Sequence, residues 1–424
     1  MKSIKSILLF LVLISLFIPA CEQFFNYFKI KKLNGSYQIT EKPQFLFTNW
    51  FSGDFQKQMG KWQNENFGFR NLLVRTHNQI GFELYNKSYA NFVVVGKENY
   101  LLDQTYIDAY TGRDNIGANK ILNKVKDFEK FDNYLNGLNK KLLLVFAPGK
   151  ASFYHEFIPD KYLKDITTTN HSMYVKYLAE SKINYIDFKT WFDLLKSKSP
   201  NALFPKNGIH WSTYGALLAA DSLLKYSSKV IGYDISKPMI EKLEWKYELQ
   251  DVDQDVGLGM NLLVGPKNDS MPYPKFRFSK NENVKKPRVL LIGDSYCWTM
   301  PLAEMNANSF ESLNFVYYNK ELHPFGKEMV PMDKVNTADL LASSDIVIIL
   351  STDANLNEFD WNFTSSILNN FDNEKVQLIN STVSQIRNDS NWFKLVKQKA
   401  MEKNISLDSM LYLDALYVIN SMKK

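Results

Sequence analysis

The stretch Val289-Leu-Leu-Ile-Gly-Asp-Ser-Tyr296 decides the fold that we expect for this chain. Four consecutive apolar residues run into Gly-Asp-Ser, which is the pattern of a strand buried on both faces that ends in a tight turn. Open α/β sheets place their functional groups at the carboxyl ends of such strands. A serine at this point can project its hydroxyl into a crevice, although an Asp or Ser helix cap after a strand has the same pattern.

Apolar runs of similar length recur along the chain, and segments with helical spacing separate several of them. We expect further strands at residues 92–95, 100–102, 142–146, 183–186, 315–318, 346–350 and 376–379. Helices are expected at 121–138, at 173–179 and from residue 212 onward. Because continuous apolar strands between helices are typical of a mainly parallel sheet, the sequence predicts a three-layer α/β/α sandwich.

The remaining segments are predicted to surround this sandwich. Residues 1–21 read as a signal peptide or membrane anchor, 22–105 as a helical region packed on the core, and 106–385 as the sandwich itself. Residues 386–424 are expected to form a helical pair, in which Asp389 or Ser390 caps the first helix and Ser406 the second.

An insertion near residues 229–286 departs from the alternation of strands and helices. It is polar, it contains several Gly and Pro residues, and it carries the acidic cluster Asp251-Val-Asp-Gln-Asp255. The Gly and the closing Glu of a calcium-binding EF-hand loop are missing from their positions, so we expect a solvated insertion.

The composition is that of a folded protein, since 45% of the 424 residues are hydrophobic and 14% are aromatic. The formal charge is +6, but only 6 of the 51 basic residues are Arg and the Lys residues are scattered, so no nucleic-acid partner is expected. Cys21 and Cys297 define neither a disulfide framework nor a metal site. We therefore predict no metal and no cofactor.

The N-terminus indicates export. Lys2 and Lys5 precede the apolar run 7–19, which ends at Ala20-Cys21. In one interpretation the chain is cleaved as a lipoprotein and Cys21 carries the lipid. In the other the segment stays as a short anchor. Both interpretations place the rest of the chain outside the cytoplasm, on the periplasmic side, tethered to the membrane.

A second chemical signal is the stretch Asn207-Gly-Ile-His-Trp-Ser-Thr-Tyr-Gly215, in which His210 stands just before a predicted helix. Alone, such a histidine is more often a cap or a packing residue. Together with Ser295 it gains weight, because a serine hydroxyl is a poor nucleophile until a positioned imidazole accepts its proton. Gly293, Asp294 and Tyr296 are expected to support the turn and the oxyanion site around Ser295.

With both signals in place, the chain resembles the SGNH-hydrolase-like domain of the bacterial alginate O-acetyltransferases and their exopolysaccharide relatives. The likeness spans roughly residues 45–355. It rests on Phe67-Gly-Phe-Arg70, Val93-Val-Val-Gly-Lys97 with Tyr100-Leu-Leu102, Phe146-Ala-Pro-Gly-Lys150, His210-Trp211 before Gly215-Ala216, and Gly293-Asp-Ser-Tyr296. The histidine block precedes the serine block, an order that is shared with this family and reversed from ordinary SGNH esterases.

The resemblance implies that Ser295 is the nucleophile and His210 the general base of an acetyl transfer to a polysaccharide. It also implies an integral-membrane O-acyltransferase as the partner that delivers acetyl. One position departs from the family, which has an aspartate two residues before the histidine where this chain has Gly208. Asn207, Asp187 or Asp353 could replace that acid in space, and we prefer a Ser–His dyad.

The Ser/His pair, the export signal and the family resemblance together leave three functions open: an O-acetyltransferase working through an acetyl-Ser295 intermediate, a carbohydrate acetyl esterase, and an inactive relative that binds a glycan or scaffolds an export complex. Trp211 beside the histidine is a candidate for stacking on a sugar, with core packing as the alternative. Cys297 is expected to be a small packed residue and not a nucleophile.

Overall fold

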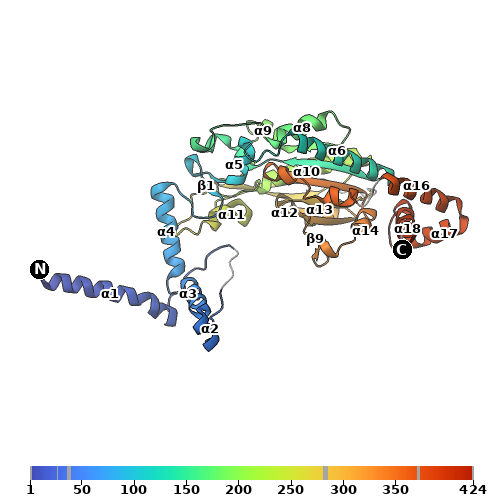
Figure 1. Cartoon of the computed structure of the whole chain (residues 1–424). Helices are drawn as coiled ribbons and strands as arrows, with labels where there is room; N and C mark the ends of the chain where they lie inside the picture. The colour runs from blue at the N-terminus through green and yellow to red at the C-terminus, as the bar shows by residue number, and fades with distance from the viewer. Residues whose placement is uncertain (1, 26, 36–39, 280–284, 370–372, 423–424) are drawn as a thin grey trace. The chain divides into compact units, whose positions relative to one another are not determined.

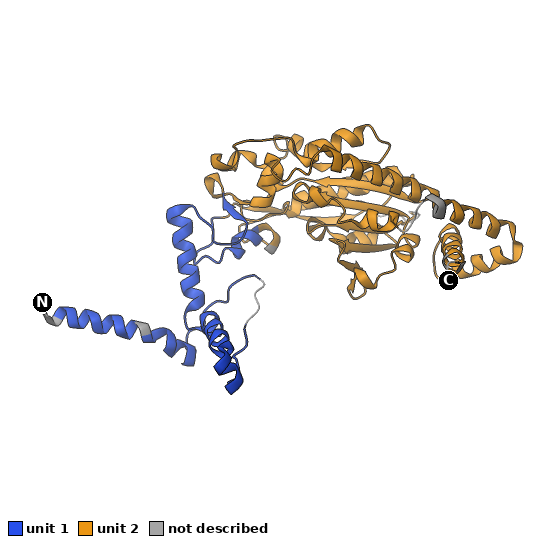
Figure 2. Cartoon of the chain, viewed as in Figure 1, with its two compact units in different colours: residues 1–95, 254–267 blue, residues 96–253, 268–424 orange. Residues whose placement is uncertain are grey.

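A computed structural model describes residues 2–25, 27–35, 40–279, 285–369 and 373–422. The chain divides into two compact units, which Figure 2 shows in different colours. The first comprises residues 1–95 and 254–267, and the second comprises residues 96–253 and 268–424.

A seven-stranded sheet forms the centre of the second unit, in the order β10-β9-β8-β7-β11-β3-β4. The strands are β3 (Lys141–Ala147), β4 (Tyr185–Asp187), β7 (Arg288–Gly293), β8 (Ser312–Tyr317), β9 (Glu321–Pro324), β10 (Val330–Pro331) and β11 (Ile346–Thr352). From β8 to β4 all neighbours are parallel, and β9 and β10 add an antiparallel edge. The expected mainly parallel sheet is confirmed.

Helices cover both faces of this sheet, as expected for a sandwich. On one face, α6 (Ala118–Gly137) and α8 (Asn170–Ala179) pack against the apolar side chains of the strands (Figure 1). Successive side chains of a strand point to opposite faces, so Leu143 and Val145 point away from α6. On that side α10 (Thr213–Ile231) contacts β3.

Shorter helices fill the connections of the second unit. They are α5 (Gln104–Thr111), α7 (Lys150–Phe153), α9 (Phe188–Leu195), α12 (Tyr296–Thr299), α13 (Leu302–Asn308), α14 (Thr337–Ala342) and α15 (Phe363–Leu368). Short strand β2 (Leu101–Asp103) precedes α5.

The C-terminal part contains three helices, α16 (Asn373–Asn388), α17 (Ser390–Glu402) and α18 (Leu407–Met422). The strand predicted at 376–379 is wrong, because this run belongs to α16. Four residues are too few to separate a period of two from a period of 3.6. Over the longer segment Ile379 and Ile386 recur on one buried helical face.

The expected caps of the last two helices are present. The carboxylate of Asp389 accepts hydrogen bonds from the backbone N–H groups of Asn391 and Trp392, each at 3.0 Å. The hydroxyl of Ser406 accepts one from Ser409 N–H at 3.1 Å. These three hydrogen bonds satisfy N–H groups that have no partner inside their helix.

The insertion is more ordered than a solvated loop. Its strands β5 (Pro238–Lys246) and β6 (Met271–Phe278) pair antiparallel, and helix α11 (Asp251–Gly259) begins between them. The prediction of a solvated acidic cluster is wrong at Asp253, whose side chain is fully buried. Along α11 and the residue that follows it, the buried positions are four and three residues apart, as on one face of a helix: Asp253, Gly257 and Met260.

The first unit is mainly helical, with α1 (Lys2–Phe25), α2 (Phe47–Ser52), α3 (Asp54–Asn66), α4 (Arg70–Tyr85) and the short strand β1 (Val93–Val95). Within α1, residues 4–25 are long and apolar enough to cross a membrane. The large apolar side chains at 7–14, 17, 18, 24 and 25 are exposed, as is Cys21. This is the segment that was predicted to direct or anchor the chain.

Candidate active site

Ser295 lies in the turn that joins β7 to α12. Strand β7 ends at Gly293, and a Cβ atom at this position would lie 2.4 Å from the Cys297 sulfur and 3.1 Å from the Leu350 carbonyl oxygen. The turn therefore needs glycine at 293, because any other residue would collide with the packed thiol. Cys297 is fully buried and burial raises the pKa of its thiol, so it is a packing residue as expected.

Asp294 fastens this turn to the end of β11. Its buried carboxylate accepts hydrogen bonds from Thr352 N–H at 2.8 Å, Thr352 Oγ1 at 2.8 Å, Asn355 Nδ2 at 2.9 Å and Tyr296 N–H at 3.1 Å. Burial raises the pKa of Asp294, and these hydrogen bonds oppose that effect. Asp294 thus supports the turn, while Thr352 and Asn355 were not predicted from the sequence.

His210 reaches the same place from a distant segment of the chain. It precedes α10, whose first turn is capped by Ser212 Oγ accepting from Gly215 N–H at 3.0 Å. The His210 Nε2 atom lies 3.0 Å from Ser295 Oγ, across a separation of 85 residues. Both side chains are partly exposed. The structure therefore brings together the two residues that the sequence paired, within reach of proton transfer and of solvent.

Two aromatic side chains brace the histidine. The hydroxyl of Tyr296 donates to Ile209 O at 2.9 Å, and its ring lies 5.0 Å from the His210 ring. Trp211 is fully buried and its indole N–H donates to Thr299 Oγ1. Of the two roles considered for Trp211, core packing agrees with this burial and sugar stacking is wrong, because no face of the ring is open to a glycan.

Lys150 holds the segment that carries the histidine. Its side chain is 1% exposed, and its Nζ atom donates to the carbonyl oxygens of Leu101 at 2.7 Å, Lys206 at 2.6 Å and Gly208 at 2.7 Å. These bonds use all three N–H groups of an ammonium. Lys150 thereby fixes the chain two residues before His210, a role that sequence reasoning missed because backbone acceptors leave no sequence pattern.

Tyr318 and Trp298 stand near the serine on the β8 side. Burial and the Asp294 carboxylate raise the pKa of Tyr318 to about 12, and hydrogen bonding to Ser295 and Asn355 opposes this. The phenol is therefore neutral and able to donate at physiological pH. Trp298, three residues after the serine, is 44% exposed and packs edge-on against Phe315. Unlike Trp211, it presents an open ring surface.

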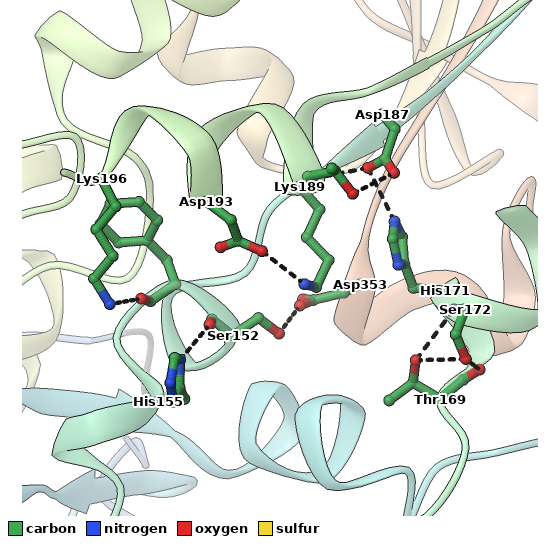
Figure 3. A network of polar contacts seen from close by, with 12 residues as sticks. Ser152, His155, Thr169, His171, Ser172, Asp187, Lys189, Asp193, Lys196 and Asp353 are labelled. Atoms are coloured by element: carbon green, nitrogen blue, oxygen red, sulfur yellow. Dashed lines mark hydrogen bonds and ion pairs between the residues drawn. The ribbon is translucent and has the colours of Figure 1, made fainter. Parts of the chain in front are cut away.

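The acids that could replace the one absent at 208 are engaged elsewhere (Figure 3). Asp187 accepts from His171 Nε2 at 3.0 Å and from Thr190 Oγ1 at 2.7 Å. Burial disfavours its charged form, but the contact with His171 outweighs burial and lowers the pKa of Asp187 to about 2. Asp353 accepts from the Ser152 hydroxyl and lines a cavity with His171 and Lys189.

The third candidate, Asn207, is buried and donates through its amide to Asn268 Oδ1. As for metals, no group of three or more His, Cys, Asp or Glu side chains suited to an ion occurs in the part of the chain that the structure describes. A serine hydroxyl and an imidazole are the reactive groups that the structure brings together at this site. This set is suited to forming and breaking an ester.

Comparison with known proteins identifies the domain. The family described as "SGNH hydrolase-like domain, acetyltransferase AlgX" matches residues 93–315, which is just over half of the chain. No curated protein sequence matches the chain.

Three solved structures illustrate the similar proteins. The O-acetyltransferase domain of Pseudomonas putida AlgJ is 16% identical, with a TM-score of 0.43, and the match covers 66% of this chain and 99% of that one. Pseudomonas aeruginosa AlgX is 13% identical, with a TM-score of 0.40, and the match covers 65% of this chain and 69% of that one. Bacillus cereus PatB1 is 12% identical, with a TM-score of 0.40, and the match covers 62% of this chain and 96% of that one.

Proposed function

This chain belongs to the AlgX family of SGNH hydrolase-like acetyltransferase domains, and on this basis we propose that it is an O-acetyltransferase of a secreted, alginate-like polysaccharide. The observation that carries the proposal is the 3.0 Å contact between His210 Nε2 and Ser295 Oγ at the carboxyl end of a central strand. An acetyl ester of Ser295 would be the intermediate.

The proposed reaction has two steps. In the first, Ser295 Oγ attacks the acetyl carbonyl carbon while its proton moves to His210 Nε2, and the leaving group departs with that proton. The backbone N–H of Ser295 stabilises the oxyanion that forms between attack and departure. In the second step a sugar hydroxyl gives its proton to His210 Nε2 and attacks the acetyl carbon. The bond from that carbon to Ser295 Oγ then breaks, and His210 returns the proton to Oγ, which restores the free serine.

The N-terminus supports a membrane-linked setting for this reaction. Residues 4–25 of helix α1 are long and apolar enough to cross a membrane, and Cys21 lies near the end of this helix. Either an uncleaved α1 or a lipid on Cys21 would tether the chain on the periplasmic side. An integral-membrane O-acyltransferase would then supply acetyl to Ser295, as the family resemblance implies.

The proposal is tested by incubating the detergent-solubilised full-length chain with 4-nitrophenyl acetate and analysing its peptides by mass spectrometry. We expect an acetyl group on the peptide that contains Ser295. Ser295→Ala should abolish the adduct, and His210→Ala should slow its formation about 10³-fold or more.

Adding acetyl-free oligomannuronate then separates the possible acceptors. Transfer of acetyl to the oligosaccharide supports the transferase, whereas release of acetate alone indicates an esterase. An adduct that persists in Ser295→Ala, or no adduct in the wild type, contradicts acyl transfer through this serine. Oligosaccharide binding without turnover, unaffected by both variants, would identify a glycan-binding relative.

A further inference from the structure

The position before the histidine has no space for the acid that the family carries there. Gly208 is buried, and a Cβ atom on it would lie 2.5 Å from the Val252 carbonyl oxygen and 2.9 Å from the Asp253 carbonyl carbon. Both neighbours are backbone atoms, which cannot rotate aside as a side chain can. The first turn of α11 therefore occupies the place that an aspartate at 208 would need.

That same turn is acidic. Helix α11 begins at Asp251, and Asp253 follows two residues later with a fully buried side chain. The backbone of this turn packs directly on Gly208, and Lys150 holds the facing segment through the carbonyl oxygens of Lys206 and Gly208. Acidic residues are thus built into the element that displaces the family's acid.

The proposed chemistry needs a hydrogen-bond acceptor, preferably a carboxylate, beside the Nδ1 atom of His210. For Ser295 Oγ to donate its proton to Nε2, the neutral imidazole must carry its own proton on Nδ1. An acceptor behind Nδ1 holds that tautomer and stabilises the cation that forms during reaction. Three other acids are used elsewhere, because Asp187 pairs with His171, Asp353 binds Ser152 and Asp294 holds the β11 end. Asp253 itself hydrogen-bonds the Tyr273 hydroxyl, but a carboxylate has two oxygens and can accept from a second donor as well.

We propose that the first turn of α11 supplies the positioning acid of His210, from Asp251 or Asp253, in place of the aspartate at position 208. The acid has moved from the histidine segment to an element some forty residues later in the chain, and glycine at 208 is what admits that element. This inference rests on the proposed function, since it assigns the third member of the same catalytic set.

The decisive measurement is the tautomer of His210, which does not require turnover. The full-length chain is labelled with ¹⁵N-histidine, and the His210 signals are assigned by their loss in His210→Asn. We expect the wild type to show the Nδ1–H tautomer above the titration range of histidine. Asp251→Asn or Asp253→Asn should shift the population toward Nε2–H, while Asp255→Asn on the same helix should leave it unchanged. An unchanged tautomer in both of the first two variants overturns the proposal.

Kinetics provide the second measurement. The effective Asp→Asn variant should lower kcat for 4-nitrophenyl acetate about 10²–10⁴-fold with little change in KM, as loss of the acid does in other triads. In a His210→Ala background the same substitution should cause no further loss, whereas general damage to the fold would add to the defect. If the wild type forms no Ser295 adduct, the proposed function fails while the tautomer result still decides this inference.

Restoring the family residue supplies the opposite test. Gly208→Asp should lower the melting temperature without raising kcat, because the new Cβ collides with the backbone of α11. A gain in kcat, or an unchanged melting temperature, would show that position 208 can accept the acid and would contradict the proposal.

Discussion

Single residues far from the reacting atoms set the geometry of the serine and the histidine. Lys150 is the clearest case, since its buried ammonium satisfies three carbonyl oxygens and one of them belongs to Gly208. Hydrogen bonds from a charged donor are stronger than neutral ones. Leaving a buried carbonyl oxygen without its donor lowers the stability of the fold by about 1–3 kcal/mol. Lys150 therefore stabilises the fold and orients His210 at the same time.

We predict that Lys150→Met lowers the free energy of unfolding by about 3 kcal/mol, because a methionine of similar length fills the space but donates no hydrogen bond. The rate of Ser295 acylation should fall at least tenfold through displacement of the 206–210 segment. Urea unfolding and the 4-nitrophenyl acetate assay measure the two effects. Lys164→Met, at an exposed lysine, is the control that should change neither.

At the scale of secondary-structure elements, the site depends on the union of two neighbouring strands. The β7 turn is not self-supporting, because the Asp294 carboxylate draws three of its four hydrogen bonds from Thr352 and Asn355 at the end of β11. Parallel strands bring their carboxyl ends to one edge of a sheet, and this pairing exploits that arrangement.

We predict that Thr352→Val, which keeps the shape of the side chain and removes its hydroxyl, costs about 1–2 kcal/mol of stability and slows acylation several-fold. The buried Asp294 carboxylate would lose one of its donors. Thr364→Val offers a matched comparison: Thr364 is equally buried, but its hydroxyl finds no partner among the described residues. Thermal melts should show Thr364→Val to be neutral or stabilising, and equal losses in both variants would contradict this account.

The elements show where sequence patterns suffice and where they do not. The apolar run 289–292 and the spacing of α6 each reveal their structure locally, and so do the Asp389 and Ser406 caps. Residues 376–379 do not, because a short apolar run fits a strand and a helix equally well. At the site, Ser295 and His210 carry recognisable motifs. Two of the three atoms nearest to a Cβ at 208 belong to the backbone of a helix that begins 43 positions later, and backbone contacts of this kind leave no mark on residue identity.

At the scale of the whole second unit, a buried lysine ties the sandwich to the C-terminal helices. Lys140 immediately precedes β3 and donates to Ala342 O at 3.0 Å, Ser344 O at 2.5 Å and Ser409 Oγ at 3.1 Å. These acceptors come from the end of α14 and from α18. Burial lowers the pKa of Lys140 to about 8. At neutral pH the folded protein therefore carries a buried charge whose desolvation lowers the free energy of unfolding.

The pH dependence of stability follows from this value. Between about pH 8 and the ordinary lysine range near 10.5, the unfolded chain binds more protons at this position than the folded chain. The contribution of Lys140 to stability is therefore lowest below pH 8 and rises with pH across this window, by at most about 3 kcal/mol. Urea unfolding of wild type and Lys140→Met at pH 7.5 and 9.5 tests this. The rise should be present only in the wild type, and parallel pH profiles would refute the assignment.

The hydrogen bonds between Asp294 and the end of β11 also bear on the order in which the site is assembled. Ribosomes deliver a protein from its N-terminus, so the histidine segment emerges 85 residues before the serine, and the partners of Asp294 emerge about sixty residues later still. A half-made chain thus holds both reactive side chains without the strand that sets their angle. The turn that carries Ser295 therefore gains its full set of hydrogen bonds only when the residues up to Asn355 have joined the fold.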